Sequence, residues 1–142
     1  MGKKVFVAMS GGVDSSVAAL LLKEQGYEVT GVFMKFWADK EALDTGSAGW
    51  YNRCCSMDAR RDAMDVCERL GIEFRTMHLE KEFKAAVVDH FIGGYKAGIT
   101  PNPCVECNRH IKFALMHDAL KEGANFVATG HYVRIDRTDG IP

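Results

Sequence analysis

The sequence lacks an excess of either charge and lacks any long hydrophobic run. Its 142 residues include 18 Lys and Arg against 19 Asp and Glu, for a formal net charge of -1. A near-neutral chain has no overall field that attracts nucleic acid or a membrane, so contact with a polyanion requires a local patch. No apolar stretch approaches the roughly 18 residues of a membrane helix, and residues 1–9 lack the features of a signal peptide. We therefore expect a cytoplasmic protein with no membrane partner.

The composition also lacks the polar bias of a disordered chain. It is 47% hydrophobic and 26% charged, and a chain of this length buries roughly 68 to 70% of its unfolded surface, so we expect one core. A disulfide framework is not indicated either, because the cysteines are five in number and the chain is long enough to fold without staples. In a reducing compartment such cysteines are more often metal ligands, catalytic thiols or core residues.

Short apolar runs alternate with helical patterns along the chain. Runs at residues 4–9, 28–34, 73–79 and 126–129 predict strands. Helical periodicity covers residues 14–25, 56–70, 83–95 and 111–120, with Ser56 as an N-cap and glycines at 26 and 71 as C-terminal ends. The alternation predicts one doubly wound α/β domain, with a mainly parallel sheet and helices on both faces. Ligands are expected beyond the carboxyl ends of the strands.

Three helices carry apolar residues that we expect in the core. Cys67 lies on the apolar face of its helix and is interpreted as a buried thiol. The first helix presents a broad apolar face, and the helix after the third strand presents an i,i+4 stripe. The members of these two sets are Val17, Ala18, Leu20, Leu21 and Leu22, and Phe83, Val87, Phe91 and Tyr95. Residues 35–53 lack periodicity and are predicted to be a long connection, and packing is the first interpretation of Cys54 and Cys55 after it.

Residues 10–16, S-G-G-V-D-S-S, lie between the first strand and the first helix. Glycines let backbone N–H groups approach a phosphate, and a helix N-terminus favours anions. The hydroxyls of Ser10, Ser15 and Ser16 can donate hydrogen bonds to the same oxygens. A carboxylate here, Asp14, is explained by Mg²⁺ or by a helix cap. The alternative is an ordinary glycine-rich turn before a capped helix.

The loop has neither the Lys of a Walker A motif nor the third glycine of a dinucleotide fingerprint. It resembles instead the S-G-G-x-D-S signature of the PP-loop ATP pyrophosphatases. The resemblance implies an adenine nucleotide alpha hydrolase-like fold. It also implies cleavage of ATP to AMP and pyrophosphate during adenylation of a substrate oxygen.

Cys104 and Cys107 form the chain's one Cys-x-x-Cys pair, directly after Pro101-Asn102-Pro103. The prolines exclude a helix through that segment, and the cysteines open the next helix. A helix N-terminus, with Arg109 nearby, should lower a thiol pKa and favour a reactive thiolate. A structural zinc site is the competing interpretation, but it needs four ligands and the pair supplies two.

Residues 98–113, G-I-T-P-N-P-C-V-E-C-N-R-H-I-K-F, resemble a signature of the bacterial tRNA-specific 2-thiouridylases, the MnmA/TrmU family. Residues 128–132 and 33–35 also match segments of that family. The resemblance implies that ATP adenylates the 2-oxygen of the wobble uridine in tRNA. A protein persulfide, carried by a second family cysteine that lies beyond residue 142 and supplied by a sulfur-relay protein or a cysteine desulfurase, then delivers sulfur.

Roles carry over from this family position by position. The resemblance implies that Cys107 is the catalytic nucleophile and that ATP binds with Mg²⁺. The implied target-base residues are Asn102, Pro103 and Cys104. The implied ATP-binding residues are Ala8, Met9, Ser10, Gly11, Gly12, Val13, Asp14, Ser15, Met34 and Gly130. His131 follows Gly130 directly, and two alternatives remain open for it: it lines the nucleotide site, or it has no part in that site.

Two features depart from the family pattern. Many members have aspartate where this chain has Cys104, and related tRNA thiolases hold a 4Fe-4S cluster with a Cys-x-x-Cys pair and one distant cysteine. Cys104 and Cys107 as cluster ligands, as a disulfide or as free thiols therefore remain open alternatives. The family chain is also longer. We expect residues 1–142 to be its N-terminal ATP-binding domain, without the central domain and C-terminal β-barrel, able to bind ATP but not to thiolate tRNA alone.

Two other functions remain open. One is a different PP-loop ligase or amidating enzyme, which would share residues 10–15 but not the Pro-Asn-Pro-Cys-x-x-Cys segment. The other is a non-catalytic nucleotide-binding or zinc-binding module. Lys96, Arg109 and Lys112 near the cysteine segment could contact tRNA phosphates or form an ordinary solvated face.

Overall fold

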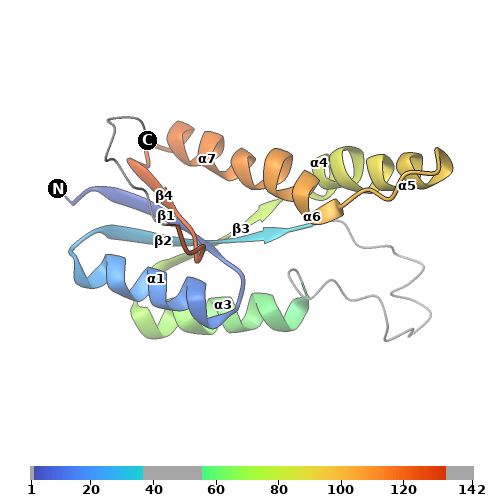
Figure 1. The fold of residues 1–142 in the computed structure, drawn as a ribbon. Coiled ribbons are helices and arrows are strands. Elements are labelled where there is room, and N and C mark those ends of the chain that lie inside the picture. The colour runs from blue at the N-terminus through green and yellow to red at the C-terminus, as the bar shows by residue number, and fades with distance from the viewer. Residues whose placement is uncertain (1, 37–55, 134–142) are drawn as a thin grey trace.

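Four parallel strands form a single sheet in the computed structural model, which describes residues 2–36 and 56–133, the side chains of 113–116 excepted (Figure 1). The strands are β1 (Lys4–Met9), β2 (Glu28–Lys35), β3 (Glu73–His78) and β4 (Phe126–Ala128). Their spatial order is β3-β2-β1-β4, so β1 lies between β2 and β4. All four predicted strands are confirmed, to within a residue at each end.

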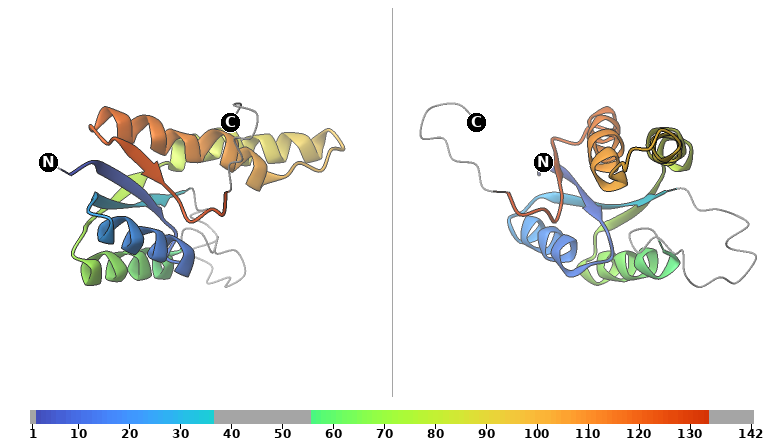
Figure 2. Two further views of the ribbon diagram at one scale, coloured as in Figure 1. Left: turned by 60° about the vertical axis from the view of Figure 1, so that its left-hand side comes forward. Right: turned by 45° about the vertical axis from the view of Figure 1, so that its right-hand side comes forward.

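Helices cover both faces of the sheet (Figures 1 and 2). One face carries α1 (Val13–Glu24) and α3 (Met57–Leu70). The other face carries α4 (Glu80–Phe83), the π-helical turn η1 (Lys84–Val88) and α5 (Asp89–Lys96), followed by α6 (Pro103–Glu106), the π-helical turn η2 (Cys107–Ile111) and α7 (Lys112–Lys121). This arrangement confirms the predicted doubly wound α/β architecture.

Local capping residues set the ends of the helices as predicted. Ser56 Oγ accepts a hydrogen bond from the Ala59 N–H at 3.1 Å, and Gly71 ends α3 in the left-handed conformation with φ 58°. Gly26, with φ 83°, follows α1 in the same way. The interpretation of Asp14 as a helix cap is wrong. Gly12 is the N-cap of α1 and Asp14 lies in its first turn, so this carboxylate needs another explanation.

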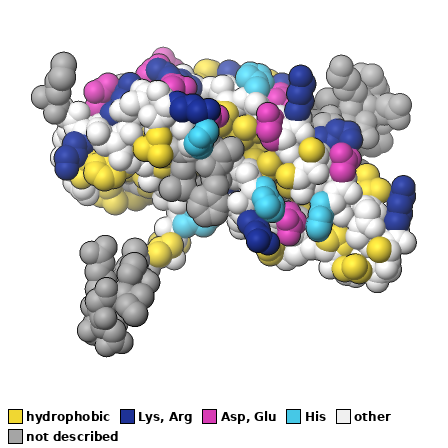
Figure 3. All heavy atoms as spheres, turned by 90° about the horizontal axis from the view of Figure 1, so that it is seen from above, with side chains coloured by type: hydrophobic (Ala, Val, Ile, Leu, Met, Phe, Trp, Pro, Cys, Tyr) yellow, Lys and Arg dark blue, Asp and Glu magenta, His cyan; other side chains and the backbone are white. Residues whose placement is uncertain are grey.

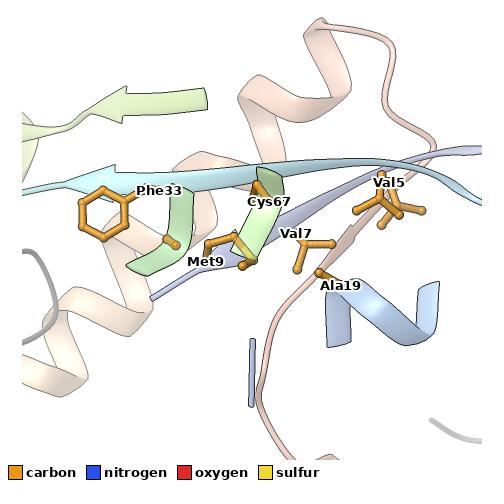
Figure 4. Close-up of a cluster of buried hydrophobic side chains, with 8 residues drawn as sticks. Val5, Val7, Met9, Ala19, Phe33 and Cys67 are labelled. Atoms are coloured by element: carbon orange, nitrogen blue, oxygen red, sulfur yellow. The ribbon is translucent and has the colours of Figure 1, made fainter. Parts of the chain in front are cut away.

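The core beneath α1 and α3 is formed by one face of the sheet (Figure 4). Cys67 is fully buried there, and burial raises the pKa of its thiol to about 11, which confirms the predicted core thiol. A Cβ at Gly31 of β2 would overlap the Cys67 sulfur. The buried residues of this cluster are Val5, Val7, Met9, Ala19, Val29, Phe33, Ala63 and Cys67.

A second buried layer lies under the helices of the opposite face. Phe6, Val32, Ala119 and Ala124 pack together beneath α7. Beside them, Phe36 stacks on Phe83 with ring centroids 5.0 Å apart. That aromatic pair belongs to a cluster with Leu79, Val87 and Ile111. Because Phe36 and Leu79 directly follow β2 and β3, this cluster marks the carboxyl edge of the sheet.

Two predicted apolar faces are only partly buried. In α1 the buried positions are Ser15 and Ala19, whereas Val17, Leu20 and Leu21 are 44%, 38% and 49% exposed. Leu22 packs against the core beside Ala19, as predicted, whereas the prediction that Val17, Leu20 and Leu21 are buried is wrong.

The apolar stripe predicted for the helix after the third strand is buried only in its first half. Phe83 and Val87 are buried, but Tyr95 is 55% exposed and contacts Phe91 instead of the core. The turn η1 adds a residue to the helical period, and α5 then extends past the sheet (Figure 1). The predicted connection 35–53 lies almost entirely outside the described residues, as do Cys54 and Cys55.

Candidate functional site

The glycine-rich loop leaves the carboxyl end of β1 and turns into α1. Gly11 has a φ of 78°, and a Cβ there would overlap the carbonyl oxygen of Ala59 at the start of α3. Glycine at this position therefore satisfies both the left-handed backbone and the close approach to α3. The loop is seated between two helix starts, at the edge where a doubly wound sheet binds its ligands.

Hydroxyl groups hold the loop in shape. Ser15, which is buried, donates from its hydroxyl to the Gly12 carbonyl at 3.1 Å, and Ser16 donates to the same carbonyl at 2.9 Å. The Ser10 N–H donates to Ser15 Oγ at 3.2 Å, and the Gly12 N–H donates to Ser10 Oγ at 3.3 Å. In this structure the serines stiffen the loop, and the hydroxyl protons of Ser15 and Ser16 are directed to backbone rather than outward.

The turn after β4, residues 129–132, contacts the glycine-rich loop although the two segments are far apart in the sequence. A Cβ at Gly130 would lie 2.8 Å from the Ser15 nitrogen, so the two backbones are in close contact. The Tyr132 hydroxyl donates to Asp14 Oδ1 at 2.7 Å, and this hydrogen bond raises the pKa of Tyr132. His131 is exposed and its ring pairs with the Thr129 hydroxyl at 2.7 Å. The contact between Tyr132 and Asp14 has no signal in the sequence.

Met34 lies beside the loop on the neighbouring strand. The parallel pairing of Met9 with Phe33 brings the next residues, Ser10 and Met34, to the same level of the sheet. Met34 packs partly against both buried layers of the α7 face. The structure thus brings Met34, Gly130 and the loop residues 10–15 to one edge, with Ala8 and Met9 ending the strand behind them.

The cysteine segment begins a helix at the same edge. Asn102 Oδ1 accepts hydrogen bonds from the backbone N–H groups of Cys104 at 3.0 Å and Val105 at 3.4 Å, and Pro103 occupies the first helical position. The prediction that the cysteines open a helix is confirmed. Asn102, which sequence reasoning assigned only to the target base, is also the N-cap.

The two cysteines differ in their surroundings. Cys104 is exposed, whereas Cys107 is half-buried and packs against the cluster that contains Phe36 and Leu79. Since those two residues follow β2 and β3, Cys107 lies at the carboxyl edge of the sheet, as the glycine loop does. Cys107 also begins the π-helical turn η2, a type of turn that is frequent at functional sites.

The sequence did not predict a cluster of charged side chains at this edge. Glu80 Oε1 lies 3.1 Å from Lys35 Nζ and 3.1 Å from His78 Nδ1. Burial alone would raise the pKa of Glu80, but hydrogen bonds from His78, from backbone and from Lys35 outweigh it and lower that pKa to about 2. The available signal was position, because Lys35 and His78 end β2 and β3, and Glu80 begins α4 two residues after β3.

The described residues do not form a metal centre. Among residues 2–36 and 56–133, no group of three or more His, Cys, Asp or Glu side chains could hold a metal ion. Cys104 and Cys107 supply two thiols, fewer than the three protein ligands that the predicted 4Fe-4S variant needs, so these residues do not fit a cluster by themselves.

The surface over α7 and α5 carries basic and acidic side chains mixed together (Figure 3). None of the helices in the described ranges combines the length and apolar character that a membrane crossing requires.

The fold and the site define a class. A parallel sheet of order β3-β2-β1-β4, with a glycine-rich loop between β1 and α1 and helices on both faces, is that of a doubly wound α/β domain. Residues 3–141 match the family model of the tRNA methyl transferase HUP domain, and the chain belongs to this family.

The chain is also similar to individual proteins of known sequence or structure. It is 49% identical, over 96% of its length, to a tRNA-specific 2-thiouridylase MnmA from Clostridium botulinum, and it spans 37% of that relative. Two solved structures share the fold at a TM-score of 0.57. A predicted subunit of tRNA methyltransferase from Methanocaldococcus jannaschii is 22% identical, with 99% of this chain and 58% of that chain covered. A glutamine-dependent NAD+ synthetase from Acinetobacter baumannii is 18% identical, with 88% and 20% covered.

Proposed function

We propose that residues 1–142 are the ATP-binding domain of a tRNA-uridine 2-sulfurtransferase of the MnmA type. The observation that carries the proposal is that the S-G-G-V-D-S loop and the helix that begins with Cys104 and Cys107 both lie at the carboxyl edge of the same sheet. The 49% identity to tRNA-specific 2-thiouridylases supports the same function. A chain that serves only to bind nucleotide does not require the second of these elements.

The proposed nucleotide site is the loop with its two neighbours. Backbone N–H groups of residues 10–15 and the start of α1 would bind the ATP phosphates, and Met34 and Gly130 would border the nucleotide. Asp14 is an exposed carboxylate at the loop and fits Mg²⁺, which commonly takes one or two carboxylates together with phosphate oxygens. Bound Mg²⁺ would offset phosphate charge.

The proposed chemistry joins ATP to the wobble uridine of tRNA. The 2-oxygen of the base attacks the α-phosphorus and pyrophosphate leaves. The terminal sulfur of a protein persulfide then attacks carbon 2 and AMP leaves. The Cys107 thiolate attacks the inner sulfur of the persulfide, so the S–S bond breaks, 2-thiouridine is released, and Cys107 is left in a disulfide that a thiol reductant reopens. Asn102, Pro103 and Cys104 would contact the base, and Cys107 would be the nucleophile beside it. The persulfide would come from a sulfur-relay protein or a cysteine desulfurase in the cytoplasm.

Nucleoside mass spectrometry of tRNA tests this proposal. A strain without its own 2-thiouridylase receives the complete gene in wild-type form, with Cys107→Ser, or with Cys104→Asp as the matched control. We expect the wild-type gene and Cys104→Asp to restore 2-thiouridine, and Cys107→Ser to abolish it while folding and ATP binding persist. Restoration by Cys107→Ser would contradict the proposal.

The same variants separate the two alternatives. Unfolding or loss of bound zinc on Cys107→Ser would favour a zinc-binding module. Adenylation of a small molecule, without any change in tRNA nucleosides, would favour another PP-loop ligase.

A further inference from the structure

The proposed ATP site has no basic side chain in its phosphate loop. The one charged residue among residues 10–16 is Asp14, which is negative. A helix N-terminus contributes only about half a positive charge, whereas a nucleoside triphosphate carries several negative charges. A cationic side chain from a neighbouring element would therefore complete the site.

Lys35 is placed to supply that charge. It ends β2, the strand beside β1, and the pairing of Met9 with Phe33 brings Lys35 to the level of Gly11. Side chains alternate along a strand, and Phe33 belongs to the core beneath α1 and α3 (Figure 4). Lys35, two residues further on, therefore lies on the face toward which the loop turns as it enters α1.

Lys35 is held by an ion pair but stays accessible to solvent. Its side chain is 47% exposed, and its ammonium group lies 3.1 Å from Glu80 Oε1. The same oxygen lies 3.1 Å from His78 Nδ1, so Glu80 keeps a partner when Lys35 moves away. Glu80 is ionised at physiological pH because its ordinary pKa of 4.5 already lies below that range, and its hydrogen bonds lower the pKa further, to about 2.

Among the described residues, Arg60 is a second basic residue close to the loop, since it follows Ala59, which Gly11 approaches. Its guanidinium group is already engaged with β3. It donates to the Thr76 hydroxyl at 3.2 Å and lies over the Phe74 ring, 5.6 Å from the centroid. Lys35 is therefore the better placed cation.

The geometry points to Lys35 as the side chain that pairs with the phosphates of the nucleotide, and to Glu80 as the carboxylate that holds Lys35 in position until the nucleotide arrives. This inference rests on the proposed function, because it takes ATP as the ligand of the loop. Binding exchanges one ion pair for another, and His78 retains the released Glu80 carboxylate.

Calorimetric titration of the 142-residue chain with ATP and with adenosine tests the inference. Lys35→Met is expected to raise the ATP dissociation constant about tenfold, to flatten its salt dependence and to leave adenosine binding unchanged. Lys35→Arg keeps the charge and is expected to stay within about threefold of the wild type. Glu80→Gln removes the competing charge, so ATP should bind about two- to threefold more tightly. The matched control is Lys121→Met, at the end of α7 in an ion pair with Asp118.

Each outcome decides between distinct conclusions. Wild-type ATP affinity in Lys35→Met, with binding abolished by Gly11→Ala, would overturn the role of Lys35 and leave the proposed function standing. Equal losses of ATP and adenosine in Lys35→Met would show a structural role and also overturn it. Weaker ATP binding in Glu80→Gln would contradict the exchange of ion pairs. Failure of the wild-type chain to bind ATP would refute the proposed function and this inference together.

Discussion

Gly31 and Cys67 illustrate how single residues constrain this core. Gly31 lies inside β2, where a glycine normally weakens a strand. Here the Cys67 sulfur of α3 occupies the space that a side chain at Gly31 would need. The glycine thus allows α3 to approach the sheet closely. The sequence predicted that Cys67 is buried but gave no indication of its partner, because the contact joins residues that are far apart in the chain.

Replacing Gly31 by alanine should destabilise the protein by about 1 to 3 kcal/mol, because overpacking forces the core apart. Adding Cys67→Ala should recover part of that loss, since it removes the overlapping sulfur. The measurement is urea unfolding. Gly93→Ala is the matched control, because Gly93 lies in α5 with nothing near its Cβ, and the change should stabilise by about 0.5 to 1 kcal/mol. Equal effects of the two substitutions would contradict this account.

Glu80 should make stability depend on acid pH. Its pKa falls from the ordinary 4.5 to about 2 in the folded protein. A lowered folded pKa contributes stability above the unfolded value, and this contribution is lost as the pH falls from about 4.5 toward 2. Glu80→Gln should therefore unfold with a shallower loss of stability across that window. Chemical denaturation at several pH values checks this, with the exposed Glu68→Gln of α3 as the control. Parallel curves for wild type and Glu80→Gln would refute it.

At the scale of secondary-structure elements, local chemistry explains what could be predicted. Strand ends, the Ser56 cap and the glycines after α1 and α3 follow from side chains acting on their own backbone, so a single sequence carries the information. The π-helical turns do not follow from such rules. Each shifts the register of the helix after it, and η1 leaves Tyr95 outside the core that its spacing predicted.

Burial on α1 was unpredictable for a related reason. A helix shows its apolar positions in sequence, but the line along which it touches the sheet depends on how β1 and the loop before α1 are placed. Here that line passes through Ser15 and Ala19, and Ser15 is buried because its hydroxyl bonds within the loop. The residues predicted for the candidate site were better located. The loop residues, Met34 and Gly130 end or follow β1, β2 and β4, and parallel topology alone brings strand ends together, whereas Asn102 to Cys107 begin a helix.

Ser56 gives a direct test at this scale. Ser56→Ala removes the side chain that accepts from the Ala59 N–H and should cost about 1 kcal/mol of unfolding free energy. Ser56→Asp keeps an acceptor at the N-cap and should restore most of it, because a carboxylate is also favourable at a helix start. Thermal and urea unfolding measure both. A Ser56→Asp variant as unstable as Ser56→Ala would mean that the cap does not stabilise α3.

At the scale of the whole molecule, the fold joins two distant stretches of the chain into one site. The loop after β1 and the turn after β4 meet because these strands are neighbours in the sheet. Gly130 permits the close approach, and the hydrogen bond from Tyr132 to Asp14 reinforces it. The match of residues 128–132 to family segments indicated that the turn matters, but only the strand order explains why it lies against the loop.

Gly130→Ala should therefore weaken ATP binding more than it lowers the stability of the fold. Its Cβ would lie 2.8 Å from the Ser15 nitrogen and push the turn off the loop, whereas Gly26 has a φ of 83° and open space around it. A ligand that binds only the folded state raises the melting temperature by mass action. We expect ATP to raise the melting temperature of the wild type and of Gly26→Ala, although Gly26→Ala starts about 1 kcal/mol less stable.

For Gly130→Ala we expect that rise to be strongly reduced. Differential scanning calorimetry with and without ATP makes the comparison, and the two glycine variants separate a general loss of stability from a loss at the site. If Gly130→Ala kept the full ATP-induced rise, the turn after β4 would lie outside the nucleotide site. The proposed site would then reduce to the loop, α1 and the end of β2, and the hydrogen bond from Tyr132 to Asp14 would serve folding alone.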